Sequence, residues 1–336
     1  MKKIIAILLV AVMALSMAAC GGASGDVTYA IVCKDASNPY MLRMISGFEA
    51  ACEKLGVKSV TKSPETATVD GQIQIVNELI AQGVKGIAIA ANDAAALEAT
   101  IKTATDAGIV VVTLDSDTKG SQMFVNQAGV EQVAQVLVES VYDMAGGEGE
   151  FAILSASSTA TNQNAWIAAM QEILKDSKYA NLKLVETVYG DDEPQKSTDE
   201  MQNLMAKYPN LKVVCCPTTV GVLACAQAVQ NAGSSIKVAG LGLPSEMNGY
   251  VGADLPCPYM FLWNPIEVGE TAAYAIQAII DGLTTGAVDE EFTAANGNTY
   301  VVLAADPSVG VQSTQIIVGP PYAFTEENIA EWAQVY

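Results

Sequence analysis

The chain has 336 residues, 51% of them hydrophobic and 16% charged, and its formal net charge is −20 at pH 7. Clustered Lys and Arg, which phosphate binding requires, are not expected in so acidic a chain, so we expect no nucleic-acid partner. The sequence contains no His, which excludes Ser-His-Asp and Cys-His catalysis and most zinc sites. The length suggests two domains, at roughly 100–200 residues each.

The chain begins with a segment typical of export rather than of the mature fold. Two Lys precede a short apolar run, Ile4–Met17, which is too short to span a membrane. Small residues directly before Cys20 resemble a bacterial lipobox. The resemblance implies a signal peptide over residues 1–19, a lipid on Cys20, and a tether over residues 20–26. An ordinary signal peptide with a chance Cys is the alternative.

From Val27 onward, apolar strands alternate with amphipathic helices in two successive series. Strands of the first series are expected at Val27–Val32, Val57–Thr61, Gly86–Ala90, Ile109–Leu114 and Met123–Val125. Strands of the second series are expected at Phe151–Leu154, Leu182–Val188, Val213–Cys216 and Val238–Leu241, with helices between them, one of them near Asn164–Leu174. The repeated pattern predicts an α/β fold of two doubly wound, Rossmann-like lobes.

The last part of the chain contains too few elements to form a third domain. A strand at Tyr259–Trp263, a long helix to Ile280 and a strand at Tyr300–Leu303 are expected to complete the two lobes. We therefore assign residues 27–126 plus 264–298 to the amino-terminal lobe, and 127–263 plus 299–336 to the carboxy-terminal lobe. Several crossings make a hinge between the lobes, and its predicted residues are Asn126, Gln127 and Trp263.

The cysteines that follow Cys20 are predicted to be buried thiols, because most lie within apolar strand or helix patterns. They are Cys33, Cys52, Cys215, Cys216, Cys225 and Cys257. Their spacing does not indicate a metal site. The acidic run Asp191-Asp192-Glu193 is interpreted as a solvated loop, because it lacks the alternating oxygen ligands of a calcium site.

Two acidic residues follow the apolar run Val110–Leu114. In a parallel sheet the carboxyl ends of the strands face the crevice where ligands bind. We therefore expect Asp115 and Asp117 at the edge of a cleft, although an Asx turn that merely ends the strand is the alternative.

The first strand also leads into polar and aromatic residues. Lys34 stands at its end, and Asn38 and Tyr40 follow at the start of a helix. Fixed donors and acceptors beside an aromatic face suit a hydroxyl-rich ligand. A helix-capping Asn with a surface Tyr would explain the same residues.

Several motifs occur in the order found in one protein family. They are Asn38-Pro39-Tyr40, Asp115-Ser116-Asp117, Thr161-Asn162-Gln163-Asn164 with Trp166, Pro217-Thr218-Thr219-Val220-Gly221 and Gly240-Leu241-Gly242-Leu243-Pro244. Together they resemble the type I periplasmic binding proteins that serve bacterial ABC sugar importers. Within that family the sequence is most similar to the rhamnose-binding and autoinducer-2-binding branch.

The resemblance also implies particular ligand contacts. Lys34, Asp115, Gln163 and Pro217 match residues that contact ligand in autoinducer-2 receptors. Asn162 and Thr219 depart from the Asp and Ala that those receptors carry. Further ligand contacts are expected at Trp166, Thr218, Leu243 and Asn264. Because the departures resemble the rhamnose-binding members, we prefer a deoxyhexose such as rhamnose over autoinducer-2 or another pentose or hexose.

The implied protein is an exported solute receptor, held at the outer face of the cell membrane by the lipid on Cys20 or located in the periplasm. A neutral monosaccharide would bind between two closing lobes and pass to an ABC permease. We expect a monomer without cofactor or metal. Two alternatives stay open: a signalling receptor, and a glycosidase in which Asp115, Asp117 and Lys34 form an acid–base set.

Overall fold

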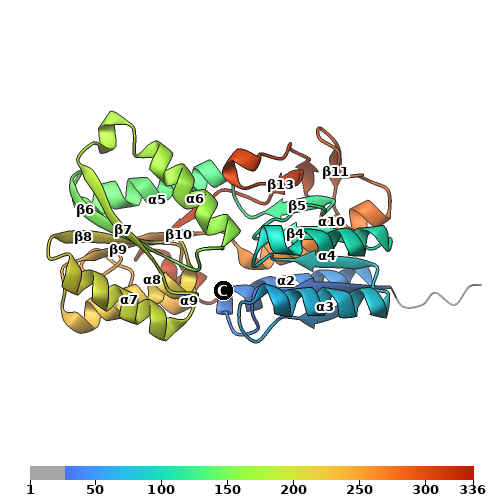
Figure 1. Ribbon diagram of the computed structural model, residues 1–336, viewed down its shortest axis with the longest axis horizontal. Coiled ribbons are helices and arrows are strands. Elements are labelled where there is room, and N and C mark those ends of the chain that lie inside the picture. The colour runs from blue at the N-terminus through green and yellow to red at the C-terminus, as the bar shows by residue number, and fades with distance from the viewer. Residues whose placement is uncertain (1–26) are drawn as a thin grey trace, which may run out of the picture.

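The computed structural model describes residues 27–336, which form two lobes lying side by side along the long axis of the molecule (Figure 1). The predicted signal peptide, the predicted lipid site at Cys20 and the whole of the predicted tether lie outside the described residues. Between residues 27 and 336, no helix is long and apolar enough to cross a membrane.

The first lobe is built on a parallel sheet of six strands in the order β13-β5-β4-β3-β1-β2. The strands are β1 (Thr28–Val32), β2 (Lys58–Lys62), β3 (Gly86–Ile89), β4 (Val110–Leu114), β5 (Met123–Asn126) and β13 (Gln315–Ile317). The central strands are almost entirely buried, which explains why their sequences are continuously apolar. The order of the first five strands is that of a doubly wound fold.

Helices cover both faces of this sheet and place their amino-terminal ends at its carboxyl edge. The helices are α2 (Pro39–Leu55), α3 (Val69–Gln82), α4 (Ala94–Asp106) and α10 (Pro265–Ile280). Apolar residues of α3 and α4 pack together with strand residues in one cluster, and α2 and α10 contribute to another. A hairpin of β11 (Glu291–Thr293) and β12 (Thr299–Val301) follows α10.

Helices α2 and α10 cross at very close range because each carries a Gly at the contact. A Cβ added at Gly47 would lie 1.9 Å from the carbonyl oxygen of Ile266, and one at Gly269 would lie 1.9 Å from that of Met44. Any larger residue would therefore push the two helices apart. The contact fixes the start of α2, and thus of Tyr40, against the rest of the lobe.

The second lobe repeats the strand order of the first. Its parallel sheet has the order β7-β6-β8-β9 and consists of β6 (Gly149–Ser155), β7 (Leu182–Tyr189), β8 (Leu211–Cys216) and β9 (Lys237–Gly240). A parallel bridge from Leu241 to Phe261 continues it into β10 (Met260–Leu262). Strand β10 in turn pairs antiparallel with β14 (Tyr322–Phe324).

Helices again lie on both sides of the sheet (Figure 1). They are α5 (Val130–Ala145), α6 (Thr161–Ile173), α7 (Pro194–Lys207) and α8 (Thr219–Ala232), with the short helices η1 (Ser177–Tyr179), α9 (Pro244–Met247) and α11 (Ile329–Trp332). The short helix η2 (Pro307–Val309) precedes β13 and contacts α6. Helix α6 begins at Thr161, three residues before the expected start. The earlier start places Asn162 and Gln163 in its first turn.

The described chain passes between the lobes in three segments. These lie between β5 and α5, between β10 and α10, and between β13 and β14. Asn126 and Gln127 belong to the first segment and Trp263 to the second. The first and third run side by side, because the amide of Val318 donates to the carbonyl of Asn126 at 2.9 Å.

The expected lobe boundary in the tail is wrong. Strand β13 pairs with β5 in the first sheet, although residues 299–336 were assigned to the second lobe. The expected break at residue 298 also falls inside the β11–β12 hairpin. The physical reason is that the edge strand β5 takes a further parallel partner, which the isolated sequence Gln315–Ile317 does not reveal. Only from β14 onward does the tail join the second lobe.

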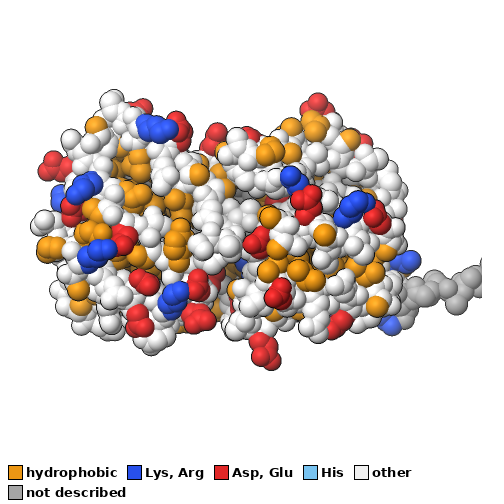
Figure 2. Space-filling model, viewed as in Figure 1, with side chains coloured by type: hydrophobic (Ala, Val, Ile, Leu, Met, Phe, Trp, Pro, Cys, Tyr) orange, Lys and Arg blue, Asp and Glu red, His pale blue; other side chains and the backbone are white. Residues whose placement is uncertain are grey.

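The predicted two-lobed, doubly wound α/β fold is otherwise confirmed. All six cysteines within residues 27–336 are free and buried, as predicted. On the face shown in Figure 2, Lys and Arg are scattered among more numerous acidic side chains and form no basic patch.

Candidate functional site

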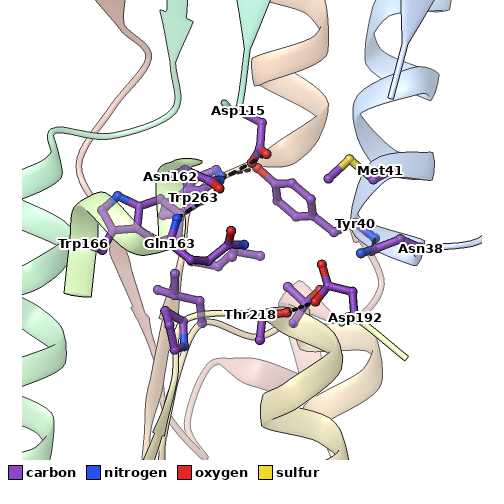
Figure 3. A pocket seen from close by; sticks show the side chains of 14 residues that line it. Asn38, Tyr40, Met41, Asp115, Asn162, Gln163, Trp166, Asp192, Thr218 and Trp263 are labelled. Carbon is purple, nitrogen blue, oxygen red and sulfur yellow. Dashed lines mark hydrogen bonds between the residues drawn. The ribbon is translucent and has the colours of Figure 1, made fainter. Parts of the chain in front are cut away.

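A cavity of about 340 Å³, including its open mouth, lies between the two lobes. Side chains from both lobes point into it (Figure 3). The cavity is lined by Asn38, Tyr40, Met41, Asp115, Asn162, Gln163, Trp166, Asp192, Pro217, Thr218, Thr219, Leu241, Leu262 and Trp263. Most residues predicted to contact ligand are therefore brought together here, although they come from four separate stretches of the sequence.

Asp115 is held at the carboxyl end of β4 in an uncommon backbone conformation. Its φ is 61°, and the amide of Ser116 donates across it to the carbonyl of Leu114 at 2.6 Å. Left-handed backbone in a residue other than Gly costs energy and persists where the surroundings enforce it, often at functional sites. Here the tight turn aims the carboxylate into the cavity, with only 3% of the residue exposed.

A buried hydrogen-bonded triad joins the two lobes at the cavity wall. Lys34 Nζ lies 2.9 Å from Asp115 Oδ2 and donates to Asn162 Oδ1 at 3.1 Å. Asn162 Nδ2 donates to the same Asp115 oxygen at 3.2 Å. The one positive and one negative charge compensate each other, so the triad presents donors and acceptors without net charge. Such a wall suits an uncharged polar ligand.

Aromatic rings form the apolar part of the cavity wall. The indole N–H of Trp263 donates to the Tyr40 hydroxyl at 2.6 Å, and the ring of Trp166 lies 5.7 Å from that of Trp263. Burial raises the pKa of Tyr40 well above its ordinary value, so the phenol stays neutral. Trp263, predicted as a hinge residue, therefore also lines the site and links it to the segment that connects the lobes.

The second lobe contributes helix starts to the cavity. Gln163 lies in the first turn of α6, and its side-chain carbonyl is buried without a hydrogen-bond partner in the described structure. Thr218 and Thr219 stand at the start of α8, which has no side-chain cap. Unsatisfied acceptors and free first-turn amides are groups that a bound polyol would satisfy.

Asp192 is a cavity residue that the sequence interpretation missed. It was assigned to a solvated loop, but the loop lies directly beyond β7, and the Asp192 carboxylate lines the cavity and accepts a hydrogen bond from Thr218. Burial raises the pKa of Asp192 above its ordinary value. The signal was available, because an acid beyond the carboxyl end of a strand is the same pattern that identified Asp115. Met41, Leu241 and Leu262 were also missed.

Three residues expected to contact ligand lie elsewhere. Asp117 accepts hydrogen bonds from the amides of Gln312 and Ser313, both at 2.7 Å, and holds the tail before β13. Asn264 accepts from the amide of Ile266 and caps α10. Leu243 is completely buried and belongs to the core of the second lobe. Asp117 and Asp115 therefore do not form an acid–base pair, because only Asp115 lines the cavity.

No group of three or more metal-ligating side chains occurs in the part of the chain that the structure describes.

Comparisons with known proteins place the chain in a family. A family model described as a periplasmic binding protein domain matches residues 29–284. A solute-binding protein of an ABC transporter from Clostridium phytofermentas, solved with bound L-rhamnose, is 47% identical, with 92% of this chain and 99% of that chain covered and a TM-score of 0.89. The D-allose-binding periplasmic protein of Escherichia coli (strain K12) is 27% identical over 77% of this chain and 86% of its own length.

LsrB from Clostridium saccharobutylicum, in complex with AI-2, has a TM-score of 0.84, with 91% of this chain and 99% of that chain covered. At 23% identity this likeness shows the fold alone.

The chain belongs to the periplasmic binding protein family, as predicted. Its relatives are sugar-binding transport proteins rather than enzymes. The family acts outside the cytoplasm.

Proposed function

We propose that the protein binds L-rhamnose, or a closely similar neutral deoxyhexose, between its two lobes and delivers it to an ABC permease. The observation that carries the proposal is the Lys34–Asp115–Asn162 triad, which combines charge compensation with a fixed set of donors and acceptors. The solved relative with bound L-rhamnose, 47% identical, supports the choice of sugar.

The shape of the site also favours a deoxyhexose. Asp115 can accept two hydrogen bonds from neighbouring ring hydroxyls, and the Gln163 carbonyl can accept a third. Met41 and Leu262 supply apolar surface to the cavity, against which the methyl group of a deoxy sugar would lie. Leaving these polar groups unpaired costs about 1–3 kcal/mol each, which is the source of selectivity.

Delivery follows from the lobe arrangement. Ligand contacts residues of both lobes only when they are close together, so its binding favours the closed form. We propose that Asn126, Gln127 and Trp263 lie in the segments that bend, and that the closed form docks on the permease. Asn162 and Thr219, which depart from the residues of autoinducer-2 receptors, argue against autoinducer-2.

Isothermal titration calorimetry with a panel of neutral ligands tests the proposal. L-rhamnose, D-allose, D-ribose, D-arabinose and AI-2 would be titrated into the mature protein. We expect a one-to-one isotherm with L-rhamnose that is at least about tenfold tighter than with the others, equivalent to 1.4 kcal/mol. Tighter binding of AI-2 or of another sugar would show that L-rhamnose is not the preferred ligand. Continued heat after saturation would indicate turnover.

We further propose that the mature protein is a monomer held on the membrane by a lipid on Cys20. Mass spectrometry of the mature amino terminus tests the anchor, with Cys20→Ser as the variant that should be released in soluble form. Recovery of an unmodified amino terminus cut at another residue would contradict it. Size-exclusion chromatography with light scattering tests the monomer.

A further inference from the structure

A second, larger space lies next to the cavity described above, between the lobes. This outer chamber measures about 920 Å³, including its mouth, and is bounded by Lys34, Thr68 and Asn92 from the first lobe and by Ser157, Gln163 and Asp192 from the second. Gln163 and Asp192 line both spaces. The inner cavity and the outer chamber therefore adjoin at these two side chains.

The triad forms the partition between the two spaces. Asp115 and Asn162 line the inner cavity, whereas Lys34, which is bonded to both, lines the outer chamber. A ligand bound against Asp115 thus has one side facing the aromatic rings and another facing Gln163 and Asp192, which border the outer chamber. A substituent on that second side would enter the outer chamber.

Two observations indicate that the outer chamber binds a polar group. First, Gln163 is only 7% exposed, and its side-chain carbonyl, at the boundary of the two spaces, has no partner within the described structure. Second, α3 and α6 both begin at the chamber, after Thr68 and Ala160, and neither has a side-chain cap. Their first-turn amides are donors without a helical partner. The chamber therefore offers both acceptors and donors.

The charges at the chamber favour a neutral occupant. Asp93, Asp191 and Asp192 line it, and its one Lys is already paired with Asp115. An anionic group would meet three carboxylates, while hydroxyl groups could donate to them. The lining contains no aromatic ring among the described residues. The chamber would therefore hold a sugar by hydrogen bonds, and contacts between sugar and aromatic rings would occur only in the inner cavity.

We propose that the outer chamber is a second carbohydrate subsite, so that the protein takes a neutral disaccharide with its deoxyhexose unit in the inner cavity and its second sugar beyond Gln163 and Asp192. The inference rests on the proposed function and extends its ligand class from a free monosaccharide to a glycosylated one.

Calorimetry on the full mature protein tests the subsite. The probes are L-rhamnose, α-L-rhamnosyl-(1→2)-D-glucose, and a disaccharide with rhamnose at its reducing end, which together place the second sugar on either side of the rhamnose ring. We expect one of the disaccharides to bind at least as tightly as L-rhamnose. Ser157→Trp should fill the outer chamber and weaken that disaccharide by about tenfold or more while changing L-rhamnose affinity less than about twofold.

Ser158→Trp is the matched control, because Ser158 is exposed, adjacent in sequence and not part of the chamber lining. It should leave both affinities unchanged. Rejection of both disaccharides together with binding of L-rhamnose would overturn the subsite and leave the proposed function standing. Binding of a disaccharide without L-rhamnose would support the subsite and overturn the free sugar as ligand, and binding of neither would overturn both.

Discussion

Asp115→Asn is the substitution that tests the binding site most directly. It keeps the size of the side chain but removes the charge that faces the ligand and pairs with Lys34. In the structure Asp115 Oδ2 lies 2.9 Å from Lys34 Nζ and accepts from Asn162 at 3.2 Å. The substitution therefore changes the hydrogen-bonding character of the triad without opening a cavity in the wall.

The expected loss follows from the bonds that change. Hydrogen bonds to a charged group contribute about 1.5–3 kcal/mol, against about 0.5–1.5 kcal/mol between neutral groups. If two sugar hydroxyls donate to Asp115, weakening each bond by about 1 kcal/mol lowers affinity by about 2 kcal/mol, or roughly 30-fold. Lys34 also loses its charged partner, so the melting temperature of the ligand-free protein should fall.

Asp117→Asn is the control, because Asp117 is equally buried on the same strand end but faces the tail. It accepts from the amides of Gln312 and Ser313, so we expect a lower melting temperature with sugar affinity within about threefold of the original. Calorimetry measures affinity, and differential scanning calorimetry measures stability. Equal loss of affinity in both variants, or unchanged affinity in Asp115→Asn, would refute the assignment of Asp115 to the ligand.

Three further predictions concern the scaffold. Gly269→Ala should reduce the free energy of unfolding in urea by about 1–3 kcal/mol, because its Cβ would meet the Met44 carbonyl, whereas Gly249→Ala, with open space around it, should not. Hydrogen bonds, chiefly from Thr284, lower the pKa of Glu290 to about 2. The ionised carboxylate of Glu290 therefore stabilises the fold above its ordinary pKa of 4.5, and this contribution disappears as the pH falls toward 2. Between pH 4.5 and pH 2, the melting temperature of Glu290→Gln should decline less than that of the original protein. The six cysteines of residues 27–336 should react with a thiol reagent only after unfolding, since all are buried, and rapid reaction of the native protein would contradict that.

Much of the site could be predicted because a parallel sheet concentrates function at its carboxyl edge. Asp115 was identified from an apolar run that ends in an acid, and Lys34 from the end of the first strand. Both lie at the interlobe wall, as does Gln163. These inferences need only local sequence and one rule of topology, so they did not depend on knowing how distant parts of the chain pair.

The errors arise where non-local pairing decides the outcome. Asp117 was assigned to the ligand because it stands two residues after Asp115, yet residues 312–313, almost 200 positions later, occupy its carboxylate. Strand β13 was placed in the wrong lobe because three residues carry little pattern of their own. Asp192 is a different case: it was left in a loop because its neighbours are polar, although it lies just beyond β7, where the strand-end rule that identified Asp115 also applies.

The segments that build the first lobe come from opposite ends of the chain. Its sheet begins with β1 at Thr28, but its last strand ends at Ile317, and α10 packs against α2 from more than 200 residues away. Closing such long loops is slow because the chain loses conformational entropy before the stabilising contacts form. A nascent chain that has not yet reached residue 317 therefore cannot complete this lobe, although the lobe begins at Thr28.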